Sequence, residues 1–354
     1  MKDKQVLLVL FGGKSSEHDV SCISAQSVLN NVPKDKYEII TIGITKDGKW
    51  FRYYGSYDKL PEDRWLDDPN ELVPAYLVPD PTVGGFIQGN EKVKVDVVFP
   101  VLHGKNGEDG TVQALLQLAE IPFVGCHMLS SAACMDKAFT NALADHAGIR
   151  QAKWLSFKQH EYRDAPQSFL RRAADELGFP IFVKPANAGS SVGITKAHNV
   201  NELADAIETA FFHDEKAVLE ECIVGRELEC AVLGNYDPIA SVPGEIVPSN
   251  DFYDYEAKYI SGTSGLLIPA EMSPSDAERI RSQAIRAYKA LDCSGLARVD
   301  FFMTEDGELY LNEINTIPGF TSISMYPKLL EYCGIPYDEL IERLIAAAIE
   351  LREA

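Results

Sequence analysis

The chain has 354 residues, of which 46% are hydrophobic and 24% charged, close to the averages for soluble globular proteins. This composition excludes a disordered or fibrous chain, and the length predicts two or three packed units. The formal charge of −20, from 33 basic and 53 acidic side chains, is spread along the chain. Such a surface repels polyanions, so nucleic acid and anionic membranes are not expected as partners.

No run of 18 apolar residues occurs, so no membrane-spanning helix is predicted. The apolar run at the N-terminus covers only Val6–Phe11 and ends in Gly-Gly, which favours a buried strand over a signal peptide. The seven cysteines are odd in number, scattered and never arranged as CxxC. This pattern favours free thiols in a cytoplasm over a disulfide framework or a zinc site.

The first 124 residues alternate between apolar runs and helical patterns, which is typical of a parallel, doubly wound α/β unit. Val6–Phe11 is branched and unbroken, as expected for a strand buried on both faces. Asp19 is the expected N-cap of the helix that follows. The expected elements are strands at Val6–Phe11, Tyr37–Thr45 and Asp96–Leu102 and helices at Val20–Leu29 and Gly110–Leu118, with an irregular stretch over residues 54–92.

A second unit begins near Cys126, and its short turns between apolar runs favour antiparallel strands. Residues 248–265 are polar and aromatic without periodicity, and long loops of this kind in compact domains are often functional, so we expect a lid. The alternative is a surface loop that packs against its own domain. The expected helices are Met135–Ala147, Glu202–Phe212, Ser273–Leu291, Tyr326–Tyr332 and Asp338–Leu351, and the expected strands are Pro180–Lys184, Ala217–Glu221, Glu227–Leu233, Ala240–Ile246, Leu296–Met303 and Glu308–Ile314.

The hairpin expected around Glu305–Gly307 carries the sharpest chemical signal. Alternate residues of a strand share a face, so Arg298 points the same way as Asp300, and Glu313 the same way as Asn315. If the strands pair, one surface carries two carboxylates, an amide oxygen and a guanidinium, and such hard oxygen ligands suit Mg²⁺. The alternative is a solvated sheet face with an ion pair. The apolar flanks favour the metal site, because buried carboxylates without a cation are costly.

A small-residue loop, Ala188–Gly193, follows Lys184 and is suited to binding an anion through backbone N–H groups and serine hydroxyls. It matches neither the P-loop nor the dinucleotide-binding pattern, and an ordinary turn is an equal alternative. Lys137 is a second candidate cation, with a solvated helix lysine as its alternative.

Two more loops, Gly12–His18 and Leu102–Gly110, follow the carboxyl ends of expected strands. Ligands of open α/β sheets bind at these ends, so both loops would face one crevice. Each loop taken alone is more consistent with a structural turn, but the occurrence of two such loops at one edge favours a binding site.

Taken together, the motifs of the chain and their order resemble those of the D-alanine–D-alanine ligases of the ATP-grasp superfamily, over residues 5–350. The motifs that carry the resemblance are FGGKSSEHDVS, HGKNGEDG, CMDK, VKPANAGSSVG, YDYEAKY, ARVDFF and LNEINTIPGFTSISMYP. The resemblance implies an α/β, ATP-grasp fold with an N-terminal parallel α/β domain (residues 1–124), a central subdomain (125–215) and a C-terminal subdomain (216–354) with the lid loop 248–265.

The resemblance further implies that two D-alanines are joined through an acyl phosphate for peptidoglycan synthesis. ATP would lie between the last two subdomains with two Mg²⁺ ions, or Mn²⁺, in a cytoplasmic homodimer. The residues implied in ATP binding are Lys137, Lys184, Ser191, Glu220, Glu221, Ile223, Glu227 and Lys258. The implied metal ligands are Asp300, Glu313 and Asn315, the catalytic residues are Glu17, Ser190, Tyr259, Arg298 and Gly319, and the substrate residues are Glu17, His103, Ser324 and Met325.

Four other functions remain as alternatives. A D-alanine–D-serine ligase of vancomycin-resistance type is disfavoured by Met325, where the resistance enzymes tend to have arginine. Tyr259 disfavours a depsipeptide ligase, because those enzymes carry a histidine in that loop. A non-catalytic nucleotide-binding module is disfavoured by the complete set of metal ligands and Arg298, and an NAD-dependent dehydrogenase by the absence of GxGxxG after either early strand.

Overall fold

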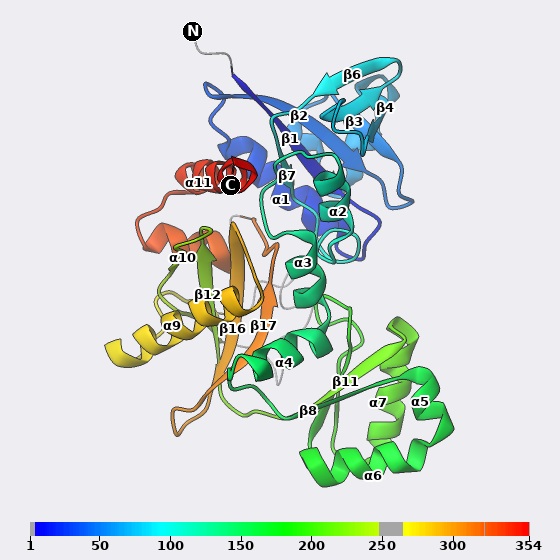
Figure 1. Ribbon diagram of the computed structural model, residues 1–354, viewed down its shortest axis with the longest axis vertical. Coiled ribbons are helices and arrows are strands. Elements are labelled where there is room, and N and C mark those ends of the chain that lie inside the picture. The colour runs from blue at the N-terminus through cyan, green and yellow to red at the C-terminus, as the bar shows by residue number, and fades with distance from the viewer. Residues whose placement is uncertain (1–3, 248–264, 322, 354) are drawn as a thin grey trace.

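The computed structural model describes residues 4–247, 265–321 and 323–353. Three sheets lie one beyond another along the long axis of the molecule, with β1 and β2 in the first, β12, β16 and β17 in the second, and β8 and β11 in the third (Figure 1). The α/β class predicted from the sequence is therefore confirmed. Within the described ranges, no helix is both long enough and apolar enough to cross a membrane.

The N-terminal sheet has seven strands in the order β6-β5-β4-β3-β2-β1-β7. Only β1, β2 and β7 are parallel, and the pairs from β2 to β6 are antiparallel, so the parallel prediction was right for three strands only. The prediction of an irregular stretch over residues 54–92 was wrong. The strands are β1 (Gln5–Gly12), β2 (Tyr37–Ile44), β3 (Trp50–Tyr53), β4 (Leu72–Leu77), β5 (Gly85–Gln88), β6 (Glu91–Lys94) and β7 (Val97–Pro100), with 3-10 turns η1 (Tyr57–Lys59), η2 (Pro61–Leu66) and η3 (Pro69–Glu71).

Strand β1 is apolar throughout because both of its faces are covered. Leu7 and Val9 pack in one core with helices α1 (His18–Asn31) and α11 (Tyr337–Glu353). Leu8 and Leu10 pack in a second core with α2 (Thr111–Leu118). A parallel strand between helical layers has this pattern, as the sequence predicted.

Two helix boundaries differ from the prediction. Asp19 is not the N-cap of α1, because Ser21 N already donates to Glu17 O at 3.0 Å and the helix starts at His18. The single helix expected at Met135–Ala147 is two helices, α3 (Met128–Met135) and α4 (Lys137–His146). They are separated at Asp136, which has an extended backbone. Its carboxylate caps α4 by accepting hydrogen bonds from the N–H groups of Ala138 and Phe139.

The central sheet has the order β10-β9-β11-β8, with antiparallel pairing throughout. One face of this sheet packs on α6 and α7, in a core that includes Phe157, Val183 and Ile207. Its other face points towards the C-terminal sheet. The elements are β8 (Trp154–Lys158), α5 (Gln159–Asp164), α6 (Pro166–Leu177), β9 (Ile181–Pro185), β10 (Thr195–Ala197), α7 (Val200–His213) and β11 (Lys216–Glu221).

The C-terminal sheet has the order β15-β14-β12-β16-β17, and β13 pairs with β12. Helix α9 covers one face through Ile280 and Tyr288. The strand expected at Ala240–Ile246 is interrupted, because Pro243 has no N–H group for a ladder. The elements are β12 (Arg226–Leu233), β13 (Ile239–Ala240), β14 (Gly244–Val247), β15 (Gly265–Leu267), α9 (Pro274–Ala290), β16 (Leu296–Met303), β17 (Leu309–Asn315) and α10 (Met325–Tyr332).

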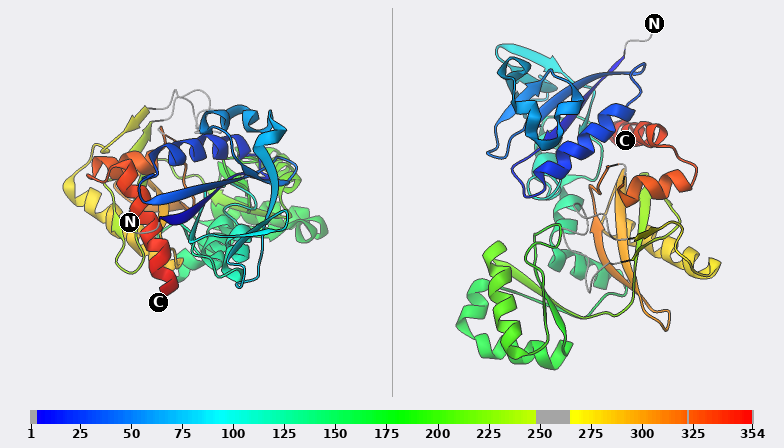
Figure 2. Two further views of the ribbon diagram at one scale, coloured as in Figure 1. Left: turned by 90° about the horizontal axis from the view of Figure 1, so that it is seen from above. Right: turned by 180° about the vertical axis from the view of Figure 1, so that it is seen from behind.

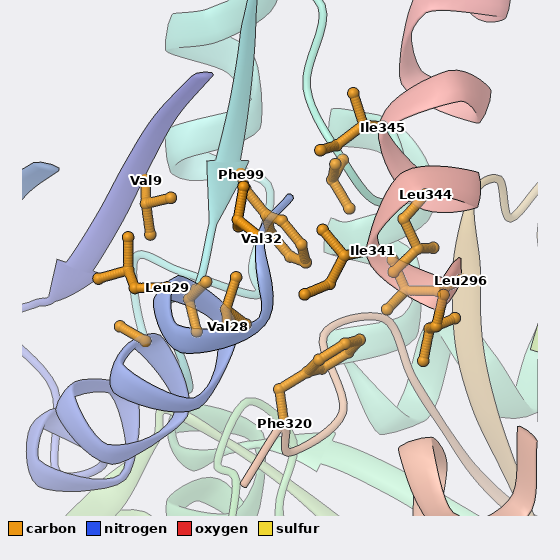
Figure 3. Close-up of a cluster of buried hydrophobic side chains, with 14 of the residues drawn as sticks. Val9, Val28, Leu29, Val32, Phe99, Leu296, Phe320, Ile341, Leu344 and Ile345 are labelled. Atoms are coloured by element: carbon orange, nitrogen blue, oxygen red, sulfur yellow. The ribbon is translucent and has the colours of Figure 1, made fainter. Parts of the chain in front are cut away.

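One hydrophobic core joins the first and last parts of the chain. Figure 3 shows Val28 and Phe99 of the N-terminal unit beside Ile341 and Leu344 of α11. The ring of Phe99 meets that of Phe320 edge-on, with 5.8 Å between centroids. Seen from behind, α11 lies against the N-terminal unit, beside α1 (Figure 2). This packing holds the loop around residue 320 against the N-terminal unit.

Candidate active site

A cavity lies between the facing sides of the central and C-terminal sheets. Its volume is about 470 Å³, which is within the range of small-molecule and cofactor sites. Strands β9 and β11 form one wall, and β12, β14, β16 and β17 form the other. The predicted ATP-binding residues among the described ranges all line it, namely Lys137, Lys184, Ser191, Glu220, Glu221, Ile223 and Glu227.

The polar cluster predicted on the β16–β17 hairpin forms. Asp300 pairs with Glu313 and Arg298 pairs with Asn315, so the four side chains share one face. The guanidinium of Arg298 donates from Nε and Nη2 to the two oxygens of Asp300, at 2.8 and 2.7 Å. The Asn315 amide donates to Asp300 Oδ2 at 3.0 Å and to Glu313 Oε1 at 3.4 Å. The cluster thus joins two carboxylates, one amide and one cation by direct hydrogen bonds.

A bulge in β17 makes this arrangement possible. The register shifts beyond Asp300, which leaves Asn312 as an extra residue in β17. Side chains alternate along a strand, so without the bulge Leu311 and Glu313 would share a face. With it, Leu311 and Ile314 both enter the core against α9, and Glu313 faces the cavity.

The sequence analysis missed Glu229, which lies on β12 directly opposite Asp300. Its Oε2 is 3.1 Å from Arg298 Nε, and its side chain is only 4% exposed. Burial acts to lower the pKa of Arg298, but Asp300 and Glu229 raise it well above its ordinary value. The signal was the alternation of Glu227 and Glu229, which places both side chains on one face of β12, and Glu227 lines the cavity.

Lys184 lies on β9 inside the cavity wall and pairs with Glu220 on β11. Its Nζ is 2.6 Å from Glu220 Oε2, and Asn141 donates to the other oxygen at 3.2 Å. Burial acts to lower the pKa of Lys184, but the carboxylates of Glu220, Glu313 and Glu227 together raise it above its ordinary value. Lys184 is therefore a fixed positive charge in the wall of the cavity.

The loop Ala188–Gly193 lies beside this charge. Ser190 and Ser191 both have positive φ, at 48° and 60°, so their backbone is held in the left-handed region. Lys137, the first residue of α4, donates from Nζ to Ala188 O at 2.8 Å. The loop and Lys137 thus form one unit at the cavity edge, as a phosphate-binding role requires, and that role remains a prediction.

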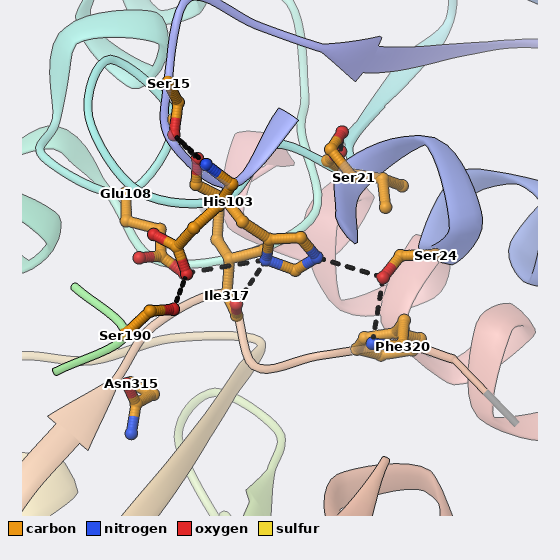
Figure 4. A network of polar contacts seen from close by, with 12 residues as sticks. Ser15, Ser21, Ser24, His103, Glu108, Ser190, Asn315, Ile317 and Phe320 are labelled. Atoms are coloured by element: carbon orange, nitrogen blue, oxygen red, sulfur yellow. Dashed lines mark hydrogen bonds and ion pairs between the residues drawn. The ribbon is translucent and has the colours of Figure 1, made fainter. Parts of the chain in front are cut away.

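A second group of polar residues lies between the loop and the N-terminal unit, as Figure 4 shows. The Ser190 hydroxyl donates to Glu17 Oε1, although the two residues are far apart in sequence. Glycines flank the carboxylate and leave room for it in this position, because a Cβ at Gly104 or Gly189 would lie 2.3 or 2.7 Å from Glu17 Oε2. Glu17 and Ser190, predicted to act together, are therefore in contact.

His103 links this group to the C-terminal unit (Figure 4). Its Nδ1 is 3.1 Å from Ile317 O and 3.7 Å from Glu108 Oε1, and its Nε2 is 3.1 Å from Ser24 Oγ. Burial acts to lower the pKa of His103, but Glu108, Glu17 and the Ile317 carbonyl raise it above its ordinary value. Its charge therefore depends on the acidic groups around it.

Ser324 and Met325, predicted to bind the second substrate, lie away from the residues described above. Met325 is buried in the core with Leu329, and Ser324 Oγ accepts from Thr321 N at 3.0 Å, close to Gly319. Neither Ser324 nor Met325 lines the cavity between the sheets. The remaining two predicted residues, Lys258 and Tyr259, lie outside the described residues, as does nearly all of the predicted lid.

Comparison with known proteins decides the family. The model of the D-ala D-ala ligase N-terminus matches residues 6–126, and the model of the D-ala D-ala ligase C-terminus matches residues 143–346. The chain belongs to the D-alanine–D-alanine ligase family. A D-alanine–D-alanine ligase of Acetivibrio thermocellus is 51% identical over 99% of this chain and 97% of its own length. The D-alanine–D-alanine ligase of Caldicellulosiruptor bescii is also 51% identical, over 98% of this chain and 96% of its own length.

Solved structures of the family agree in fold. The VanG D-Ala:D-Ser ligase from Enterococcus faecalis is 43% identical, with a TM-score of 0.91 over 98% of this chain and 100% of its own. The D-alanine–D-alanine ligase from Coxiella burnetii is 36% identical, with a TM-score of 0.86 over 99% and 96%. The chain is thus a ligase with the predicted ATP-grasp type of α/β fold, and its exact domain boundaries remain a prediction.

The residues of this D-alanine–D-alanine ligase family member also fit the Mg²⁺ that the family implies. Asp300, Glu313 and Asn315 supply carboxylate and amide oxygens on one face, and hard oxygen ligands are what Mg²⁺ prefers. The buried carboxylate of Glu229 lies on the neighbouring strand, so Arg298 faces three acidic groups in this cluster. A divalent cation would offset this negative charge.

Proposed function

We propose that this chain joins two D-alanines to form D-alanyl-D-alanine, with cleavage of ATP to ADP and phosphate. The observation that carries the proposal is the continuity of the site. Asn312 and Glu313 line both the large cavity and a neighbouring one of about 40 Å³, which also touches Glu108 and Gly189. The nucleotide end and the amino-acid end therefore meet at the carboxylate cluster, where a phosphoryl group must pass from one to the other.

At the nucleotide end, the cavity offers separate surfaces for base and phosphates. Glu221 and Ile223 lie in the segment after β11 and would take the adenine, and Glu227 on β12 would take the ribose. Lys137 and Lys184 would bind the phosphates. The Nζ of Lys137 is held beside the small-residue loop, and the Nζ of Lys184 is held beside Glu220. Their charges would oppose the repulsion between the phosphates and an approaching carboxylate.

At the centre, Asp300, Glu313 and Asn315 would hold Mg²⁺. Bound there, Mg²⁺ would neutralise charge on the phosphates during transfer. The role of the protein is to keep these three side chains on one face, which the bulge at Asn312 and the hydrogen bonds of Asn315 achieve.

At the amino-acid end, the carboxylate of Glu17 would bind the ammonium of the first D-alanine. Ser190 holds the Glu17 carboxylate in place by a hydrogen bond. The carboxylate of that D-alanine would then attack the γ-phosphate, displace ADP and form an acyl phosphate. Attack by the neutral amine of the second D-alanine would produce a tetrahedral oxyanion, which collapses to the amide as phosphate leaves and the amine loses a proton. Arg298, fixed by Asp300, and the backbone N–H of Gly319 would stabilise this charge.

A second candidate is a ligase that takes D-serine as its second substrate. It is favoured by the fold match to the VanG D-Ala:D-Ser ligase, which is 43% identical over its whole length. We favour D-alanine, because Met325 of this chain is an apolar, buried residue. The curated relatives described above, at 51% identity, carry the D-alanine–D-alanine name.

The test is phosphate release with ATP, Mg²⁺ and D-alanine, with each omitted in turn and with D-serine or D-lactate added in competition. We expect phosphate release that requires D-alanine and yields D-alanyl-D-alanine as the main product by mass spectrometry. Mainly D-alanyl-D-serine in the competition would establish the second candidate. Phosphate release that does not depend on D-alanine would refute both.

We also propose that the enzyme is a cytoplasmic homodimer that uses Mg²⁺ or Mn²⁺. The thiols support a reducing compartment, because all seven cysteines are free and Cys134 Sγ lies only 3.8 Å from Cys293 Sγ without a bond. Sedimentation equilibrium would test the dimer, and a single species of about 39 kDa would contradict it. Activity that stays unchanged after metal chelation would contradict the metal requirement.

A further inference from the structure

A group of charged side chains lies behind the turn that carries Glu17. His18, the first residue of α1, places Nε2 at 2.7 Å from Asp63 Oδ1 in the 3-10 turn η2. Lys46 Nζ lies 2.9 Å from Asp63 Oδ2 and 2.8 Å from Asp19 Oδ1. Only 1% of the His18 side chain is exposed. The proposed reaction uses none of these four residues.

Both ring nitrogens of His18 have hydrogen-bond partners. Its Nδ1 lies 2.8 Å from Gly13 O, and its Nε2 lies 2.7 Å from Asp63 Oδ1. Burial acts to raise the pKa of Asp63, but Lys46 and His18 lower it below its ordinary value. His18 therefore joins the turn before α1 to η2 through both sides of its ring.

The backbone at Asp63 is strained in a way that brings its carboxylate to His18. Glu62 and Asp63 have φ of 62° and 57°, so two successive residues other than glycine occupy the left-handed region. Such strain persists only where the surroundings enforce it, and it clusters at functional sites. The contacts of Asp63 with His18, Lys46 and the Trp65 indole, which donates to Oδ1 at 3.2 Å, supply that enforcement.

A metal site is the alternative for this group, because the ligand atoms of His18, Cys22 and Asp63 lie within 4.8 Å of one another. The chemistry argues against it. Burial and the nearby carboxylates of Asp63 and Asp19 raise the pKa of the Cys22 thiol, so the thiolate that binds metals is disfavoured. Lys46 already supplies a cation to Asp63.

We propose that the His18–Asp63 ion pair is a positioning device for Glu17. The bond from His18 to Gly13 O closes the turn of residues 13–18, and inside it Glu17 N donates to Ser15 Oγ at 3.0 Å. Asp63 anchors this closed turn to η2 from outside. The pair thereby sets where the Glu17 carboxylate stands for the ammonium of the first D-alanine, and this inference rests on the proposed function.

The test compares three variants in the strained turn. Glu62→Gly and Asp63→Gly relieve the same kind of backbone strain, but only the second removes the carboxylate from His18, and the Glu62 side chain is exposed. Asp63→Asn keeps the shape and loses the charge. We expect Asp63→Asn and Asp63→Gly to raise KM for the first D-alanine at least about fivefold, the scale of losing a hydrogen bond to a charged group. KM for ATP should stay constant, and Glu62→Gly should match the wild type in both constants.

A second variant keeps the inference testable if the Asp63 variants fold poorly. His18→Gln removes the ring that joins Gly13 O to Asp63, so it should also raise KM for the first D-alanine while KM for ATP stays constant. Asp63 and His18 variants with the KM values of Glu62→Gly would overturn the inference. That result would leave the proposed ligase activity untouched, whereas a wild type without D-alanine-dependent phosphate release would refute the activity itself.

Discussion

Glu229 and Asp300 lie opposite each other on strands β12 and β16, and the guanidinium of Arg298 contacts both carboxylates, at 3.1 and 2.7 Å. Two like charges in this position repel, and both are buried. Arg298 is therefore as much a structural requirement of the C-terminal sheet as a candidate for catalysis.

Replacing Arg298 by Met should lower the free energy of unfolding by about 3–5 kcal/mol, because buried carboxylates are left uncompensated. Urea unfolding at pH 7 would measure the loss. The double variant Arg298→Met with Glu229→Gln removes one of the opposed charges and should regain part of it. A double variant that is no more stable than the single one would contradict this account.

Replacing Glu313 by Gln should reduce turnover at least about 10²-fold with the fold intact, because one ligand charge is lost at the centre of the site. Phosphate release at saturating Mg²⁺ measures the effect. Glu305→Gln, in the exposed turn of the same hairpin, is the matched control and should behave as wild type. Turnover near wild type in Glu313→Gln would remove this residue from the proposed metal site.

Replacing Lys184 by Met should cost about 3–5 kcal/mol at pH 7, because it breaks a buried pair with Glu220. The pKa of Lys184 is raised above its ordinary value of 10.5, so its stabilising effect is fully present below that pH and is lost as the pH rises through the folded-state value. The stability difference between wild type and variant should thus be constant from about pH 7 to 9 and shrink only above about pH 10.5.

The control is Lys158→Met, an exposed lysine on β8 of the same sheet. It should have little effect at any of these pH values, since exposed charges contribute little. A difference for Lys184→Met that declines already between about pH 7 and 9 would contradict the direction of the shift.

Replacing Glu108 by Gln should destabilise the protein more at low pH than at high pH. Glu108 raises the pKa of His103 above its ordinary value of 6.5 although burial opposes it, so their attraction is fully present below that pH. It is lost as the pH rises through the folded-state value. Urea unfolding at about pH 5.5 and 8.5 should show the larger loss at the lower pH, and Glu91→Gln on β6 is an exposed control.

The sequence could predict the chemistry of the hairpin, because Arg298 and Asp300 share a face by local alternation alone. It could not predict the bulge at Asn312, which depends on how β17 pairs with β16. Glu229 was missed for the same reason, since its importance comes from the strand beside it. The contact of Glu17 with Ser190 was expected only from the family resemblance, because no periodicity links residues so far apart.

The antiparallel half of the N-terminal sheet was missed for a different reason. Strands β4, β5 and β6 are short and contain Pro74 and Gly85, residues that normally weaken a strand prediction. Long-range pairing with β3 overrides these local preferences. Similarly, Asp136 looks like an interior helix residue in sequence, although its carboxylate starts a new helix, α4, and so places Lys137 at the site.

The core shared by the two ends of the molecule has a consequence for synthesis on the ribosome. The faces of β7 and α1 that hold Phe99 and Val28 are covered by Ile341 and Leu344, which are translated more than 200 residues later. Domains generally fold in the order in which they are made, but here the first unit keeps an apolar face open until α11 has emerged. A nascent chain stalled before α11 should therefore depend on chaperones, however completely its first sheet has paired.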